Sequence, residues 1–196
     1  MADDDQLIAR LRGGDEAAFR LAVSTHHSAL MRFARALVGD AIADEVVQET
    51  WLKALAALDG FEGRSSLRTW LLGILRNHAV TRLRAEWRVA AAGSAEDAEA
   101  AGWFLPDGHW RNPPSPWAAE TPEALLAAKE LSGAIEAARR ALPPAQRAVL
   151  ALRDLEGLEM VEICNILELQ PSHARVLLHR ARRALWLAVE RQRGRR

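Results

Sequence analysis

Apolar residues recur with helical periodicity along most of the chain. From residue 7 to residue 38 they are spaced by three and four positions, and Gly39-Asp40 then marks a stop. A second periodic stretch covers residues 41–58 and ends before Asp59-Gly60. Its predicted apolar face contains Val47, Trp51, Ala54, Leu55 and Leu58. Both patterns predict amphipathic helices.

A third helix is predicted for residues 67–89, after the short polar loop FEGRSS. Ser65 or Ser66 is the expected N-cap, because a hydroxyl oxygen can accept from the first free backbone N–H groups of a helix. Within this helix, we assign at least Leu71 and Leu75 to the core.

The pattern changes over residues 90–120. This stretch has no sustained period, and it contains four prolines, three glycines and an acidic bias, which are typical of a linker. It also contains Trp103, Trp110 and Trp117, and aromatic residues are unusual in a solvated tether. We therefore expect the linker to dock, either on its own domains or on a partner.

Helical patterns resume after the linker. Thr121-Pro122-Glu123 is typical of a helix start, and the helix it opens runs to about residue 142. Pro143-Pro144 begins the next helix, which ends near Gly157. A short helix, a turn around 168–170 and a longer helix from about residue 172 follow, with no strand pattern. The prediction is an all-α fold of two small helical domains: an N-terminal helical bundle (1–89) and a C-terminal helix-turn-helix domain (121–196), joined by the acidic, Pro- and Trp-containing linker (90–120).

The last predicted helix has an apolar stripe on one side and a basic face on the other. The stripe contains Ala174, Leu177, Leu178, Ala181, Leu185 and Ala188. The basic face contains Arg175, His179, Arg182 and Arg183, flanked by Arg180. In a helix-turn-helix such a face binds duplex phosphates, and residues near the helix start (Ser172, His173, Arg175) reach base edges. The alternative is a solvated arginine face on an ordinary bundle helix. The turn has Glu168 where a glycine often occurs, and Cys164 in the short helix is interpreted as a packed thiol.

Charge is distributed unevenly, although the formal net charge is zero. Residues 1–90 are neutral, residues 91–128 carry −5 and residues 129–196 carry +5. One cysteine, no basic leader and no apolar run of membrane-spanning length lead us to expect a cytoplasmic protein without membrane insertion. No phosphate-binding glycine loop or spaced ligand cluster is present, so we expect no cofactor, no metal and no enzyme activity.

Two further surfaces are candidates for binding. The first is the FEGRSS loop with the helix after it, because aromatic rings and interleaved arginines hold unstacked bases; a core role for its apolar members is the alternative. Its candidate residues are Phe61, Ser65, Ser66, Arg68, Thr69, Trp70, Arg76, Asn77, Arg82 and Arg84. The second is an acidic helix face that would dock a basic partner or remain solvated. It contains Asp44, Glu45, Gln48 and Glu49.

The stretches DEVVQETWLKALAALDGFEGRSSLRTWLLGILRNHAVTRLR and LPPAQRAVLALRDLEGLEMVEICNILELQPSHARVLLHRARRAL resemble, in this order, the two conserved domains of bacterial extracytoplasmic-function (ECF) sigma factors. The resemblance implies a promoter-specificity subunit that binds core RNA polymerase and promoter DNA, and that an anti-sigma factor regulates. It implies that the acidic face, with Trp51 added, docks on polymerase. It further implies that the loop and third helix recognise and melt the −10 element, and that the helix-turn-helix reads the −35 element.

The recognition helix departs from many family members, which carry a basic residue where this chain has Leu177. Two alternatives to the sigma factor remain at this stage. One is a helix-turn-helix regulator that acts without replacing sigma, and the other is a helical adaptor that never touches DNA. The loop and helix from Phe61 should matter only for a sigma factor.

Overall fold

The computed structural model describes residues 2–82 and 122–193, and these residues form helices and connecting turns without a strand. The all-α prediction is therefore confirmed for this part of the chain. Arg84, the linker at 90–120 and its three tryptophans lie outside the described residues.

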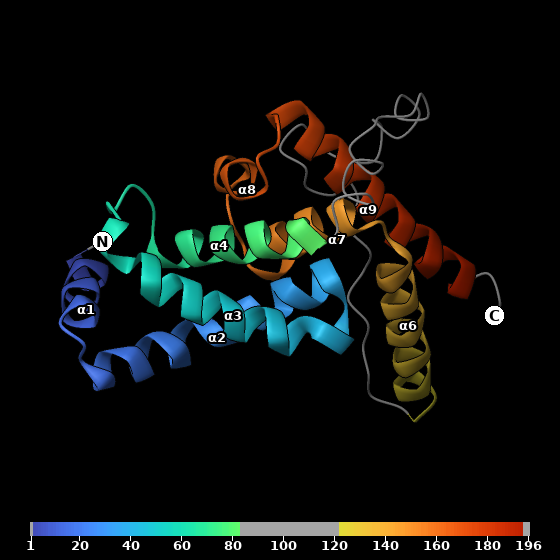
Figure 1. Ribbon diagram of the computed structural model, residues 1–196. Coiled ribbons are helices and arrows are strands. Elements are labelled where there is room, and N and C mark those ends of the chain that lie inside the picture. The colour runs from blue at the N-terminus through green and yellow to red at the C-terminus, as the bar shows by residue number, and fades with distance from the viewer. Residues whose placement is uncertain (1, 83–121, 194–196) are drawn as a thin grey trace.

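The N-terminal bundle consists of α1 (Ala2–Arg12), α2 (Glu16–Val38), α3 (Asp40–Ala57), the short 3₁₀ turn η1 (Leu58–Gly60) and α4 (Leu67–Arg82). Helices α2, α3 and α4 each pack against the other two (Figure 1). Large apolar side chains between them are fully buried, among them Phe33, Leu37, Val46, Leu72 and Leu75. Burial of one such side chain contributes about 1.5–3 kcal/mol, so this shared core holds the three helices together.

The periodic stretch at 7–38 is two helices and not one. Gly14, at a φ of +73°, turns the chain between α1 and α2. Asp15 then caps α2, because its carboxylate accepts hydrogen bonds from the backbone N–H groups of Ala17 (2.8 Å) and Ala18 (3.1 Å). The apolar period continues across this break, which is why periodicity alone did not detect it.

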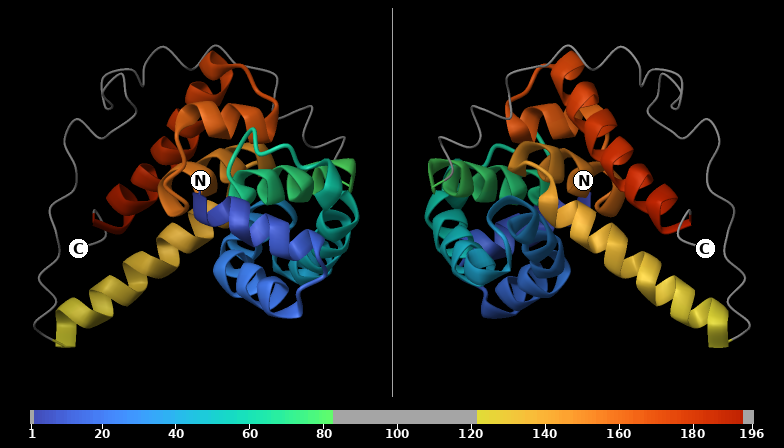
Figure 2. Two further views of the ribbon diagram at one scale, coloured as in Figure 1. Left: turned by 90° about the vertical axis from the view of Figure 1, so that its left-hand side faces the viewer. Right: turned by 90° about the vertical axis from the view of Figure 1, so that its right-hand side faces the viewer.

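The C-terminal domain consists of α6 (Pro122–Ala141), α7 (Pro144–Leu150), the π-helical turn η3 (Ala151–Leu155), α8 (Met160–Leu167) and α9 (Pro171–Arg193). Helix α9 packs against α6, α7 and α8. Figure 2 shows α6 and α9 extending together to one side, away from the N-terminal bundle. Gly157 ends the η3 segment at a φ of +68°, as its position in the sequence predicted.

The two domains pack against each other. Helix α7 lies on α2 and helix α8 lies on α4, so that one apolar core continues from the bundle into the helix-turn-helix (Figure 1). The protein thus has the predicted two-domain layout, with the two domains packed together in a closed arrangement. None of the helices in the described ranges combines the length and the apolar character that crossing a membrane requires.

Candidate nucleic-acid interface

Helices α8 and α9 form the predicted helix-turn-helix. A capping box starts α8, because the backbone N–H of Glu159 donates to the Glu162 carboxylate at 3.1 Å. Glu168 ends α8 in the left-handed region, with a φ of +53°, at the position where a glycine was noted to be missing. Cys164 is buried, and desolvation raises the pKa of its thiol, which fits the predicted packed role.

The apolar stripe of α9 faces the core as predicted. Ala174, Leu177, Leu178, Ala181 and Ala188 are buried, and Leu185 is partly buried. Leu177, where the resemblance led us to expect a basic residue, is therefore a core residue. On the other side, Ser172 and Arg175 are exposed in the first turns. His173, His179, Arg180 and Arg183 are partly exposed along the same helix.

Arg182 lies in a different environment from the other basic residues of α9. Its side chain is only 8% exposed, and it forms a two-pronged contact with the Asp154 carboxylate at 2.5 and 3.1 Å. Asp154 belongs to the η3 turn, so this pair ties α9 to the preceding segment. We therefore interpret Arg182 as a residue that stabilises the domain, and its predicted contact with DNA remains untested.

The loop between η1 and α4 is anchored at its base and exposed at its tip. The Arg12 guanidinium donates to the backbone carbonyls of Leu58 (3.2 Å) and Phe61 (2.5 Å). The Phe61 ring is buried and packs on Trp70, with 4.9 Å between ring centroids. Ser65 and Ser66 lie exposed on the loop, and the Ser66 hydroxyl accepts from the backbone N–H of Thr69 at 3.1 Å, which confirms a serine N-cap.

Several polar residues of α4 face the C-terminal domain. The Thr69 hydroxyl donates to the Glu162 carboxylate at 3.0 Å. Arg76 is 8% exposed and binds the Leu167 carbonyl at 3.0 Å and the Glu168 carboxylate at 2.9 Å. Asn77 remains exposed on the same helix. The side chain of Arg82, the last residue of α4, is not described.

Arg68 meets Glu156, the most enclosed carboxylate of the contact between the domains. The Glu156 side chain is 0% exposed and accepts from Arg32 at 2.5 and 3.0 Å and from Arg68. Arg68 also donates to the Glu156 backbone carbonyl at 3.1 Å. Burial disfavours the charged carboxylate, but the hydrogen bonds and charges of the two arginines outweigh it and hold the pKa of Glu156 below its ordinary value. Nothing in the local sequence pattern predicted this residue's role.

The candidate polymerase-docking face of α3 is confirmed as exposed only in part. Asp44, Glu45 and Gln48 are exposed. Glu49 lies 2.5 Å from the His78 ring, and Trp51 is partly buried, edge-on to Phe19.

Sequence reasoning missed two apolar members of this α3 face. Leu52 is 68% exposed and Leu55 is 44% exposed, although Leu55 was predicted to face the core. Leu55 is exposed because α2 and α4 pack against only one side of α3. Ala54 lies on that side and is buried, whereas Leu55 points away from it. The exposed face therefore combines acidic and apolar side chains, a composition typical of a protein-docking surface.

An exposed helix start in a helix-turn-helix, together with a second helix that carries arginines, is typical of a DNA-binding protein. Two family models match the chain: sigma-70 region 2 at residues 22–89 and sigma-70 region 4 at residues 132–185. The first covers the loop and α4, and the second covers α8 and most of α9.

Relatives of known function cover nearly the whole chain. The RNA polymerase sigma-H factor of Pseudomonas aeruginosa is 32% identical over 190 residues, which span 95% of this chain and 94% of that protein. The ECF RNA polymerase sigma-E factor of Escherichia coli (strain K12) is 31% identical over 182 residues, 93% of this chain and 92% of that protein. The chain therefore belongs to the sigma-70 family, in its ECF class, as its motifs predicted.

Two solved structures share the fold. CnrH, in complex with the cytosolic domain of CnrY, superposes with a TM-score of 0.59 at 22% identity, over 95% of this chain and 97% of that chain. The sigma factor RpoE of Bartonella quintana, in complex with the anti-sigma factor NepR, superposes with a TM-score of 0.57 at 24% identity, over 88% of this chain and 96% of that chain. These two proteins and the present chain therefore share a fold.

Proposed function

We propose that this sigma factor reads the −35 element with the first turns of α9 and the −10 element with the FEGRSS loop and α4, while α3 binds core RNA polymerase. The observation that carries the proposal is the order of the two matched regions, each of which contains one of the candidate surfaces described above. The same layout does not favour a regulator that acts without replacing sigma, because such a regulator needs no region 2.

On α9, Ser172, His173 and Arg175 are placed best for contacts with base edges, because they lie at the start of the second helix of the helix-turn-helix. His179, Arg180 and Arg183 follow along the helix and suit phosphate contacts. This division assigns sequence reading to the helix start and affinity to the basic residues further along.

On the N-terminal domain, Ser65 and Ser66 present hydroxyl groups at the exposed loop, and Phe61 with Trp70 forms the aromatic base beneath it. Arg68, Thr69, Arg76 and Asn77 of α4 are assigned to the same element, and Arg82 and Arg84 are assigned to it from the sequence alone. Binding free energy for strand separation would come from stacking and from phosphate contacts, with no hydrolysis and no enzyme activity.

The partners follow from the same assignment. The acidic and apolar face of α3 would bind the clamp of core polymerase. An anti-sigma factor would regulate the free protein, as the complex of RpoE with the anti-sigma factor NepR suggests. A protein that acts on chromosomal promoters would work in the cytoplasm. We also propose domain limits of 1–89 and 121–196, with 90–120 as the linker.

Transcription with purified core polymerase on a fragmented genomic library tests this proposal. Wild type should produce transcripts from specific start sites. Arg175→Ala should weaken them, since loss of a base contact costs about 1–3 kcal/mol, or roughly 5- to 150-fold. The matched control is Arg20→Ala, an exposed arginine of α2 that pairs with Glu16, and it should transcribe like wild type.

Two results would reject the proposal. One is a chain that directs no specific transcripts yet binds duplex DNA tightly without polymerase, which is the behaviour of an independent helix-turn-helix regulator. The other is equal activity of Arg175→Ala and wild type, which would remove α9 as the reading helix.

A further inference from the structure

We propose that α1 holds the FEGRSS loop at both of its ends, and that Arg12 and Asp4 of this helix thereby determine how selectively the loop reads the −10 element. Both are positioning residues, because they act on DNA only through the loop that they hold. The inference rests on the proposed function, since that proposal assigns the loop, but not α1, to the −10 element.

Helix α1 is itself fixed on the N-terminal bundle. Ile8 is buried, and Leu7 and Leu11 pack against the core and are partly buried. Arg10 pairs with Asp15 at 2.8 Å across the turn into α2. Figure 1 shows α1 at the same end of the bundle as the start of α4, and α1 packs against η1. This helix can therefore act as a rigid support for the loop that joins η1 to α4.

Arg12 holds the beginning of the loop. Its guanidinium donates to the backbone carbonyls of Leu58 at 3.2 Å and Phe61 at 2.5 Å, and the carbonyl of Asp59 lies 3.4 Å from the same nitrogen. A planar guanidinium bound to several carbonyls leaves the backbone little freedom to turn, because its donors have a fixed geometry. Arg12 therefore sets the direction in which the chain leaves η1, and with it the position of the Phe61 ring on Trp70.

Asp4 holds the end of the loop. Its carboxylate accepts from the backbone N–H of Leu67, the first residue of α4, at 3.3 Å. The first N–H groups of a helix lack acceptors within that helix, and a negative charge near a helix N-terminus is favourable. Asp4 and Arg12 are eight residues apart in the sequence, or about 12 Å along the axis of α1. One helix thus keeps the two ends of the loop at a set separation.

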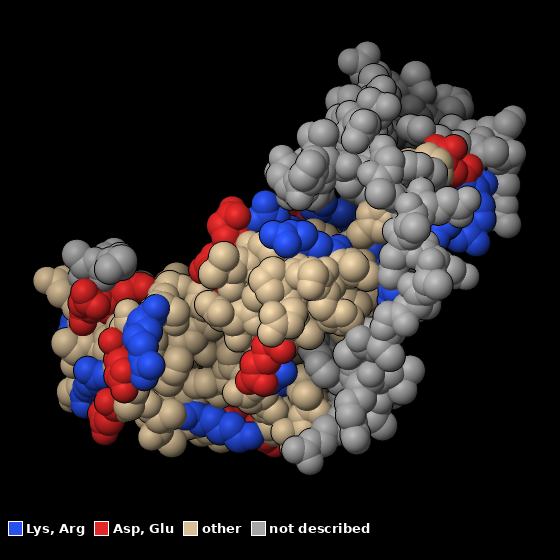
Figure 3. Space-filling model, turned by 90° about the horizontal axis from the view of Figure 1, so that it is seen from above, with Lys and Arg blue, Asp and Glu red and all other residues tan. Residues whose placement is uncertain are grey.

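The tip between these two anchors carries two of the side chains proposed to read DNA. Every residue from Glu62 to Ser66 is exposed, and Gly63 turns the chain with a φ of +70°. Glu62 pairs with Arg64 at 2.6 Å, and acidic and basic side chains lie next to one another at this end of the molecule (Figure 3). A loop whose ends are fixed samples fewer conformations. The hydroxyl groups of Ser65 and Ser66 can therefore keep the single geometry that discrimination between bases requires.

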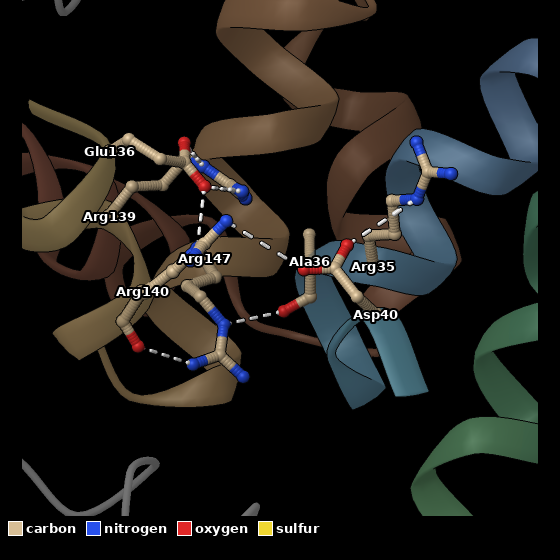
Figure 4. A network of polar contacts seen from close by, with 7 residues as sticks. All are labelled: Arg35, Ala36, Asp40, Glu136, Arg139, Arg140 and Arg147. Atoms are coloured by element: carbon tan, nitrogen blue, oxygen red, sulfur yellow. Dashed lines mark hydrogen bonds and ion pairs between the residues drawn. The ribbon is translucent and has the colours of Figure 1, made fainter. Parts of the chain in front are cut away.

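Variants that remove each anchor test the proposal, and each has a conservative counterpart. Arg12→Ala removes the donors to the carbonyls, whereas Arg12→Lys keeps a cation there. Asp4→Ala removes the acceptor at the start of α4, whereas Asp4→Asn keeps a carbonyl oxygen. The matched control is Arg147→Ala. Arg147 likewise donates to distant backbone carbonyls, those of Ala36 (2.7 Å) and Leu37 (3.4 Å), but at the C-terminal end of α2 (Figure 4).

Selectivity is measured with each full-length variant bound to core RNA polymerase. Two libraries of one promoter found with wild type, one randomised in the −10 element and the other in the −35 element, are transcribed, and a transcribed barcode identifies each template. Arg12→Ala and Asp4→Ala should lower the preference for the best base of the −10 element at least about fivefold, the lower end of what one base contact contributes. Arg12→Lys and Asp4→Asn should retain most of this preference, and the −35 preference should not change in any variant.

The outcomes separate this proposal from the proposed function, and circular dichroism melts check that every variant folds. Folded Arg12→Ala and Asp4→Ala proteins with the −10 preference of wild type would overturn the role of α1 and leave the sigma factor assignment intact. An equal loss in Arg147→Ala, or an equal loss of the −35 preference, would also overturn it, since either marks general destabilisation. Failure of wild type to direct specific transcripts would overturn the proposed function instead. If Arg12→Ala does not fold, the comparison of Asp4→Ala with Asp4→Asn decides alone.

Discussion

Two arginines of the same helix should behave in opposite ways when they are replaced by alanine. Arg175 is exposed near the start of α9. Arg182, two turns later, is 8% exposed and holds the Asp154 carboxylate with two hydrogen bonds. We expect Arg182→Ala to destabilise the fold and Arg175→Ala to weaken DNA binding alone.

The size of the stability effect follows from the burial of the pair. Asp154 is 33% exposed, so water compensates part of the lost contact, and the cost lies near that of a hydrogen bond to a charged group, about 1.5–3 kcal/mol. For a chain of this length, that shifts the melting temperature by roughly 3–12 °C. Arg175→Ala should stay within about 0.5 kcal/mol of wild type, as exposed substitutions usually do.

Urea denaturation followed by circular dichroism measures both values. A double-mutant cycle with Asp154→Asn and Arg182→Gln isolates the pair. If the two side chains interact only with each other, the double variant loses little more unfolding free energy than either single variant. The reasoning is refuted if Arg182→Ala has the unfolding free energy of wild type while the slope of its duplex affinity against salt concentration decreases by the amount expected for one lost phosphate contact. That result would make Arg182 a DNA-binding residue.

Four further expectations follow from the structure. Leu72→Ala should cost about 2–5 kcal/mol in urea denaturation, because the side chain is fully buried, and a smaller loss than that of an exposed leucine would contradict the packing. Leu52→Ala, at 68% exposure, should leave unfolding unchanged and weaken binding of core polymerase in a pull-down; unchanged binding would remove it from the docking face. Arg12→Ala should accelerate amide hydrogen exchange in the FEGRSS loop, since it removes the bonds to the backbone carbonyls at the loop base, and unaltered exchange would show that the loop is held by other contacts. Burial opposes the charge of Glu156, but its arginine partners lower its pKa, so its contribution to the closed arrangement is complete above the ordinary value of 4.5 and is lost as pH falls through the lowered pKa. Small-angle scattering should therefore show that the two domains of the wild type separate on acidification. The same change in Glu156→Gln would refute the role of this carboxyl.

Local chemistry predicted most helices and their ends. The serine cap of α4, the glycine after η3 and the apolar stripe of α9 are all determined by neighbours within a few residues, so the sequence pattern is sufficient to find them. The break between α1 and α2 was missed, because the apolar period continues through it. Gly13-Gly14-Asp15 nevertheless contains a visible signal, a pair of glycines followed by an N-cap residue.

Long-range pairing could not be predicted in this way. Arg182 looked like one more residue of a basic face, and only the fold shows that Asp154, 28 positions earlier, lies beneath it. Arg76 likewise reaches a carbonyl 91 positions away. Leu55 satisfied the apolar period of α3 but lies where no helix of the described fold covers it. Periodicity identifies which face a residue occupies, and the neighbouring elements decide what that face meets.

The distance in sequence between Arg68 and Glu156 has a consequence during synthesis. The arginine leaves the ribosome 88 residues before its carboxylate partner. At about 5–20 residues per second, the N-terminal bundle spends roughly 4–18 s with this arginine uncovered. For that interval each nascent chain presents a cationic helix to the messenger and ribosomal RNA around it, and completion of the second domain ends the exposure.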